Sequence, residues 1–218
     1  ISNFLGLLTL AVFLPTFGAL LIVVPVISRR YIKHVALSFV ATELLITAVI
    51  FIRYYLNRDA GLQMVDRLSW IPIDSFPVEY FLGVDGLSAP MVLLTGVLGF
   101  VAIFASWNIT HRIREHFAWL LILQTGVLGV FTSLDFFLFF LFWEVELIPM
   151  FFLIAIWGSG RKEYSAMKFL IFTLAGSAAM LVGILILMAS TNSLDMTQLP
   201  DKIQGAQLLV PSVVVCSL

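Results

Sequence analysis

The sequence has few charged residues and almost no cysteine, and each shortage excludes a class of protein. Only 11% of its 218 residues are charged, and the net charge is −1. Soluble domains carry about 25% charged residues, and nucleic-acid binding needs a basic surface. The single cysteine, Cys216, can form neither a disulfide within the chain nor an iron–sulphur cluster, which takes about four thiolates. We therefore expect no nucleic-acid partner and no cluster held by this chain.

Histidines and nucleotide-binding motifs are also scarce. The chain has three histidines, His34, His111 and His116, and all three fall in predicted connections between apolar segments. We interpret them as solvated loop residues. A membrane haem needs histidines within the spans, so a cytochrome-like carrier is disfavoured. No GxGxxG or GxxxxGK[ST] motif is present, and nothing in the sequence indicates nucleotide binding.

Long apolar runs dominate the chain instead. Apolar residues make up 61% of it, and the mean hydropathy is +1.07. A transmembrane helix takes about 20 mostly apolar residues. We predict an all-α polytopic membrane protein, with residues 1–218 forming one antiparallel transmembrane bundle. Its predicted spans are 4–27, 32–52, 87–107, 117–132, 136–157 and 164–189, followed by the apolar run 206–218, interpreted as a truncated seventh span.

The connections predict the orientation. Most of the basic residues fall in the first, third and fifth connections, and cytoplasmic loops are enriched in lysine and arginine. The odd-numbered connections are therefore expected to be cytoplasmic, with the N-terminus outside. The long polar segment 57–84 is predicted to be an external loop, with a short hairpin on the surface. The basic residues concerned are Arg29, Arg30, Lys33, Arg112, Arg114, Arg161 and Lys162.

Two glutamates, Glu144 and Glu146, lie in the apolar run 136–157, which contains no lysine or arginine. An acid at the centre of a bilayer costs roughly 2.5–3.5 kcal/mol even on mild insertion scales, so it marks a functional site by default. Glu144 is about 13 Å along the helix from Asp135, which places it near the midplane. Glu146 points about 200° away from Glu144 around the helix. For each acid the alternative is a protonated side chain that hydrogen-bonds a neighbouring helix and serves packing only.

Other polar residues within the spans have weaker assignments. Lys168 either extends to the cytoplasmic surface or forms a cationic step between that surface and Glu144. Glu43 is interpreted as a packing residue in the second span. Residues 175–179 are small and are predicted to pack closely on the fifth span. Asp135 is predicted to cap that span.

Three stretches resemble a known family. They are GVDGLSAPMVLLTG, SLDFFLFFLFWEVELIPMFFLIAIWG and YSAMKFLIFTLAGSAAMLVGI, within residues 83–189. They are similar to the proton-pumping, antiporter-like membrane subunits of the NADH:quinone oxidoreductase, complex I, and in particular to the type called subunit M or chain 4. The double acid in WEVELIP is most similar to the cyanobacterial and plastid versions.

This resemblance implies that Glu144 carries protons and that Lys168 belongs to a buried polar axis, with Glu146 as a further candidate. In the family a lysine on the seventh helix pairs with the glutamate, so the chain is expected to be an N-terminal fragment covering roughly the first half. It implies no cofactor here, since NAD(P)H or ferredoxin, FMN, iron–sulphur clusters and quinone are bound by partner subunits. The implied partners are other complex I membrane subunits, especially neighbouring antiporter-like ones, in a bacterial inner or thylakoid membrane.

The resemblance thus predicts a proton-translocating subunit of an enzyme complex with no redox centre of its own. Two alternatives stay open at this point. A subunit of a multisubunit cation/proton antiporter or of a membrane-bound hydrogenase shares the fold and the glutamate. A structural membrane scaffold would use the acids only to hold helices together.

Overall fold

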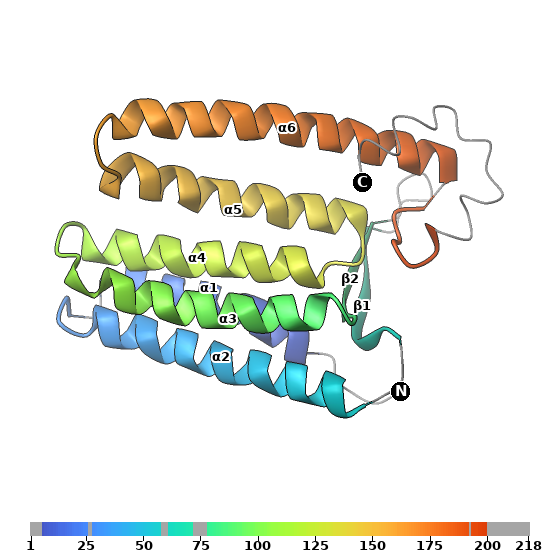
Figure 1. Cartoon of the computed structure of the whole chain (residues 1–218), viewed down its shortest axis with the longest axis horizontal. Coiled ribbons are helices and arrows are strands. Elements are labelled where there is room, and N and C mark those ends of the chain that lie inside the picture. Colours follow the sequence, from blue (N-terminus) through green and yellow to red (C-terminus); the bar gives the residue numbers. More distant parts are fainter. Residues whose placement is uncertain (1–5, 26–27, 58–60, 72–77, 192, 200–218) are drawn as a thin grey trace.

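The computed structural model describes residues 6–25, 28–57, 61–71, 78–191 and 193–199. Its helices lie side by side and alternate in direction, with a two-stranded hairpin across one end (Figure 1). The elements are α1 (Leu7–Val23), α2 (Ile32–Leu56), β1 (Gln63–Ile71), β2 (Val78–Val84), α3 (Ser88–Ala105), the 3-10 turn Ser106–Asn108, α4 (Ile113–Thr132), α5 (Phe136–Trp157) and α6 (Lys162–Thr191).

Five of these helices, α2 to α6, are long and apolar enough to cross a membrane. This confirms the antiparallel transmembrane bundle as the fold class. The expectation of six spans exceeds the finding, because α1 is an apolar helix of only 17 residues. The predicted seventh span, 206–218, lies outside the described residues.

The helix connections lie at two opposite ends of the bundle. The connections after α1, α3 and α5 share one end, and the hairpin and the α4–α5 connection share the other (Figure 1). We call these the basic end and the hairpin end. β1 and β2 pair antiparallel within the segment 57–84, so the hairpin expected there is present.

The α4–α5 connection joins the hairpin to the segment after α6 by main-chain hydrogen bonds. Leu134 N donates to Phe81 O of β2 at 2.9 Å, and Phe136 N donates to Leu194 O at 3.0 Å. Met196 N returns a bond to Leu134 O at 2.9 Å. The start of α5 is therefore held between two extended segments.

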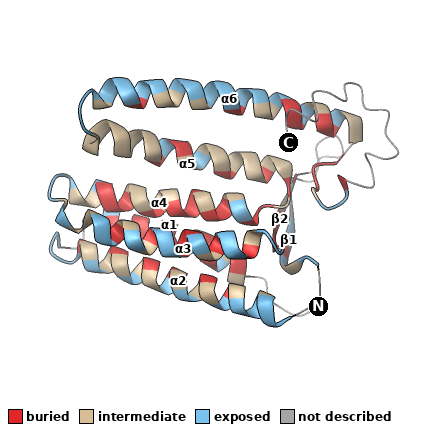
Figure 2. Ribbon diagram, in the orientation of Figure 1, coloured by how far each residue is buried: buried red, intermediate tan, exposed pale blue. Residues whose placement is uncertain are grey.

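α4 lies at the centre of the bundle. This helix packs on α1, α3 and α5, whereas α6 packs on α5 (Figure 1). Glycines allow the close approach: a Cβ at Gly129 of α4 would overlap the Phe142 ring of α5, and one at Gly126 would come within 2.9 Å of Glu146 Cβ. Small residues allow helices in lipid to pack closely. Close packing matters there because an apolar side chain is about as stable against lipid as against another helix. Figure 2 accordingly shows buried residues along α4 and exposed ones along most of α6.

Candidate functional site

Asp135 fixes the start of α5, the helix that carries both candidate acids. Its Oδ1 accepts hydrogen bonds from Phe137 N at 2.9 Å and Leu138 N at 3.0 Å, and its Oδ2 accepts one from Glu79 N at 3.4 Å. The predicted cap is thus present. Burial raises the pKa of the Asp135 carboxyl, and the three N–H donors oppose that rise in part.

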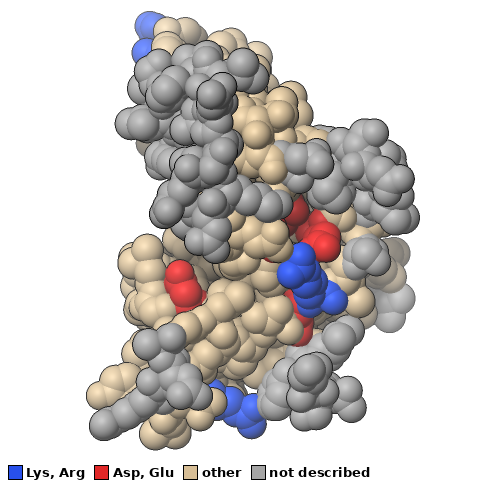
Figure 3. Space-filling model, turned by 90° about the vertical axis from the view of Figure 1, so that its right-hand side faces the viewer, with Lys and Arg blue, Asp and Glu red and all other residues tan. Residues whose placement is uncertain are grey.

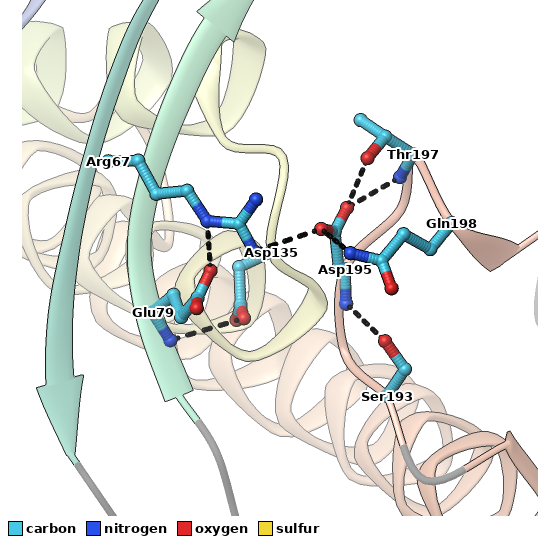
Figure 4. A network of polar contacts seen from close by, with 7 residues as sticks. All are labelled: Arg67, Glu79, Asp135, Ser193, Asp195, Thr197 and Gln198. Carbon is cyan, nitrogen blue, oxygen red and sulfur yellow. Dashed lines mark hydrogen bonds and ion pairs between the residues drawn. The ribbon is translucent and has the colours of Figure 1, made fainter.

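A polar network ties this cap to the hairpin and to the segment after α6 (Figure 4). Arg67 of β1 pairs with Glu79 of β2, and its Nη2 lies 3.3 Å from Asp195 Oδ2. Asp195 also accepts from Thr197 N at 2.8 Å. The hydrogen bond with Glu79 raises the pKa of the Arg67 guanidinium. Figure 3, a view of the hairpin end, shows a basic group between acidic ones, with a separate acidic group and further basic groups elsewhere on this face.

Glu144 lies on the side of α5 that faces α6. It follows Phe140 by one turn, and Phe140 packs beside Ile184 and Met188 of α6. Among the residues that the structure describes, the buried Oε1 of Glu144 has no hydrogen-bond partner. Within the described residues the site therefore holds a half-buried acid with one unsatisfied oxygen, roughly 20 Å from the basic end of α5.

Glu146 lies on the other side of α5, against α4. Its Cβ and backbone contact Gly126, and the same α5 stripe contains the buried residues Phe142 and Pro149. The two acids therefore face different neighbouring helices, as their spacing predicts.

Lys168 is exposed in the structure, and it is not brought to Glu144. Its Nζ lies 5.9 Å from the centre of the Phe172 ring, one turn along α6. Ala166, two positions earlier, is buried, so Lys168 points about 200° away from that buried face. Along the bundle it also lies roughly 10 Å nearer the basic end than Glu144.

The expectation that residues 175–179 pack closely on α5 is wrong for most of them. Ser177 is buried, whereas the other four are exposed. Small residues predict an interface only when they fall on the inward stripe of the helix, and most of this run does not.

His116 also corrects an expectation. His111 is exposed in a connection, as predicted, and His34 is exposed but lies in the first turn of α2 rather than in a connection. His116 lies in the first turn of α4 with only 6% of its surface exposed. Its ring centre is 4.7 Å from that of Trp157, which makes an edge contact with it from the end of α5. In the described part of the chain neither ring nitrogen has a hydrogen-bond partner. Nothing in the local sequence signals this contact, because Trp157 is far along the chain.

Glu43 is the most deeply buried acid of the described chain, with 0% of its surface exposed. Gln124 Nε2 donates to Glu43 Oε1 at 2.9 Å and to Thr95 O at 2.8 Å, which joins α2, α3 and α4. This contact agrees with a packing role, although Glu43 Oε2 has no partner among the described residues. The sequence identifies Gln124 as a polar residue within an apolar helix, but it does not indicate that Gln124 is the partner of Glu43.

The comparisons with known proteins identify the family of one segment of the chain. Residues 133–215 match the family described as NADH:quinone oxidoreductase/Mrp antiporter, transmembrane. That segment, which contains α5, α6 and both acids, belongs to this family of antiporter-like membrane proteins, and the resemblance inferred from the sequence motifs is confirmed.

The particular relatives are proteins named NAD(P)H-quinone oxidoreductase chain 4. One from Synechococcus sp. (strain JA-2-3B'a(2-13)) is 39% identical over 201 residues, which cover 91% of this chain and 37% of the relative. The chloroplastic protein from Daucus carota is 37% identical over 184 residues, covering 84% of this chain and 36% of the relative. The chain thus spans little more than a third of the length of these curated relatives.

Solved structures show the same fold at lower identity. An archaeal membrane-bound sulfane sulfur reductase matches with a TM-score of 0.80 and 23% identity over 95% of this chain and 41% of that one. Respiratory complex I from Thermus thermophilus matches with a TM-score of 0.77 and 22% identity, over 89% of this chain and 39% of that one. The Mrp complex from Dietzia sp. matches with a TM-score of 0.76 and 18% identity, over 94% and 22%. These likenesses support the fold alone.

Proposed function

We propose that this chain is part of a proton-translocating membrane subunit of an NAD(P)H:quinone oxidoreductase, and that Glu144 is its proton carrier. The observation that carries the proposal is a mid-membrane acid inside the matched family segment, with a buried oxygen that has no partner among the described residues. The names of the relatives supply the enzyme class. NAD(P)H or ferredoxin, flavin, clusters and quinone would be bound by partner subunits, and neighbouring antiporter-like subunits would flank this one.

The proposed mechanism is a change in the charge of Glu144 driven by a nearby cation. A positive group close to a carboxyl group favours its ionised form, and withdrawal of that group favours the protonated form. Moving one charge against about 150 mV costs roughly 3.5 kcal/mol. An ion pair at about 4 Å is worth roughly 4 kcal/mol at an effective dielectric constant of about 20. One mobile cation is therefore sufficient.

The described residues would have different roles in proton transfer. α5 carries Glu144 toward α6, and Asp135 fixes the helix start, so the acid keeps its depth. Lys168, on the far side of α6 and nearer the basic end, would receive protons from that end and deliver them toward Glu144. In this proposal the basic end is cytoplasmic, since basic residues cluster there, in a bacterial inner or thylakoid membrane.

The direct test is Glu144→Gln in the full-length subunit, assembled in its complex and reconstituted into vesicles. The amide keeps the shape of the side chain but binds no exchangeable acidic proton. We expect loss of proton pumping with assembly retained. The measurements are vesicle acidification and quinone reduction in the same preparation.

Glu163→Gln provides the matched control, because Glu163 is an exposed acid at the start of α6. It should pump at the wild-type ratio. Wild-type pumping by Glu144→Gln would show that this residue is not the carrier. A change confined to thermal stability would identify a structural scaffold instead.

A further inference from the structure

Among the described residues, none supplies a counter-charge to an ionised Glu43 carboxylate. It is fully buried at the middle of α2, which packs on α1, α3 and α4. The basic residues of its own helix that lie nearest on either side are Lys33 and Arg53, each about 15 Å away along the axis. Within their membrane-spanning middles, α1, α3 and α4 contribute no lysine or arginine.

The hydrogen bonds of Glu43 also favour an uncharged acid. Its one donor, Gln124 Nε2, is shared with Thr95 O, and Oε2 has no partner in the described part of the chain. Buried charges require a counter-ion or several donors, and they become neutral when these are absent. A protonated carboxyl group fits this environment, so Glu43 holds a proton in the described arrangement.

Further polar residues continue from Glu43 toward α5 at the same membrane depth. Glu43, Gln124 and Glu146 each lie roughly 17 Å from the basic end of their helices. Next to Gln124, the hydroxyl of Thr125 is 2.7 Å from that of Thr16 in α1. One residue further, Gly126 contacts Glu146. These five polar residues, which we call the transverse row, lie on α2, α4, α1 and α5, between Glu43 and Glu146.

We propose that Glu43 and Glu146 form a second proton-binding pair, separate from Glu144, that exchanges one proton across α4. In each exchange an O–H bond breaks at one carboxyl group and forms at the other, so the row carries one charge sideways. The hydroxyls of Thr125 and Thr16 pass the proton on, and Gln124 orients the Glu43 carboxyl group. This inference rests on the proposed function, because the pair serves a proton-translocating subunit.

The test uses Glu43→Gln, Glu146→Gln and the double variant in the full-length protein within its complex, reconstituted into vesicles. Both single variants keep hydrogen-bonding side chains of the same size. Each should lower the rate of proton pumping at least about tenfold, since a positioned proton-transfer group contributes that much or more. The double variant should pump no slower than the slower single variant, because residues on one route act as a unit.

Two threonine substitutions provide a matched control. Thr16→Val removes a hydroxyl from the transverse row and should slow pumping. Thr42→Val removes a hydroxyl next to Glu43 on the exposed face of α2, where Thr42 Oγ1 donates to Ser38 O at 2.8 Å, and it should pump normally. Wild-type pumping by either glutamate variant would overturn the proposal, as would a double variant whose loss equals the product of the two single losses.

If Glu43→Gln fails to assemble, infrared difference spectroscopy of the assembled complex without that substitution provides a second test. A carbonyl band from a buried protonated acid should change during turnover and persist in Glu144→Gln. Absence of such a band overturns the pair. If Glu144→Gln abolishes pumping while Glu43→Gln does not, only this inference fails. If Glu144→Gln pumps normally, the proposed function fails and the pair fails with it.

Discussion

α4 and α6 are both long apolar helices, yet their surroundings differ. In the most apolar stretch of each, 56% of the α4 residues are buried, against 22% for α6. Contacts from α1, α3 and α5 surround α4, and α6 rests on α5 (Figure 1). In lipid, apolar residues are stable on either surface, so hydropathy does not separate an inner helix from an outer one. The separating features are glycines that contact side chains and polar groups that bond across helices.

Among the substitutions that test this difference, Gly129→Ala should cause the largest loss of stability. The new methyl group would overlap the Phe142 ring in the α4–α5 contact, and overpacking costs typically 1–3 kcal/mol. We expect a lower unfolding temperature for the full-length protein in detergent, measured by thermal denaturation.

Gly176 in α6 is the matched control for Gly129, because nothing lies within 4 Å of an added Cβ there. Gly176→Ala should leave stability unchanged or raise it by up to about 1 kcal/mol through helix propensity. Equal losses at the two glycines would contradict the distinction between an inner and an outer helix.

Phenylalanine at His116 should stabilise the buried end of α4. It removes two ring nitrogens that lack partners among the described residues and keeps the edge contact with Trp157. Leaving a buried polar group unsatisfied costs about 1–3 kcal/mol. A gain of about 1 kcal/mol should raise the melting temperature by roughly 2–4 °C. His111→Phe, at an exposed site, should give no such gain, and a lower melting temperature for His116→Phe would show that the imidazole has a partner.

The smallest expected effect is a pH dependence at Asp135, where α5 begins. Burial raises the pKa of this carboxyl above its ordinary value near 3.8, and Glu79 adds to the rise. The folded state then binds more protons than the unfolded state, so stability falls as pH rises from about 4 through the raised pKa. Asp135→Asn caps a helix about as well and should flatten that slope. A flat wild-type profile, measured by thermal denaturation from acid to neutral pH, would contradict the assignment.

Helix positions were predictable where end signals are local. The span 136–157 coincides with α5, because Asp135 caps its start and Gly158 follows its end. α4 begins at Ile113 rather than at residue 117, since its first turn carries polar residues that extend beyond the apolar run. The hairpin could be predicted as an element, but its register depends on pairing across the turn.

The candidate site was predictable only in part. Spacing along one helix separates Glu144 from Glu146, and the structure places them toward α6 and α4. The partner of Glu43 was not predictable, because Gln124 lies 81 residues away and on a helix two spans later. The burial of His116 likewise depends on a tryptophan from another helix. Contacts between residues of helices far apart in the sequence can be identified only from the three-dimensional packing.

The extended segment before α5 limits how the helices can move. Its main-chain bonds to β2 and to the segment after α6 anchor α5 and the last turn of α6 to one small sheet-like patch. Sliding of either helix along its axis would break several of these bonds together. These bonds therefore hold the depth of α5 relative to the segment after α6 at the hairpin end.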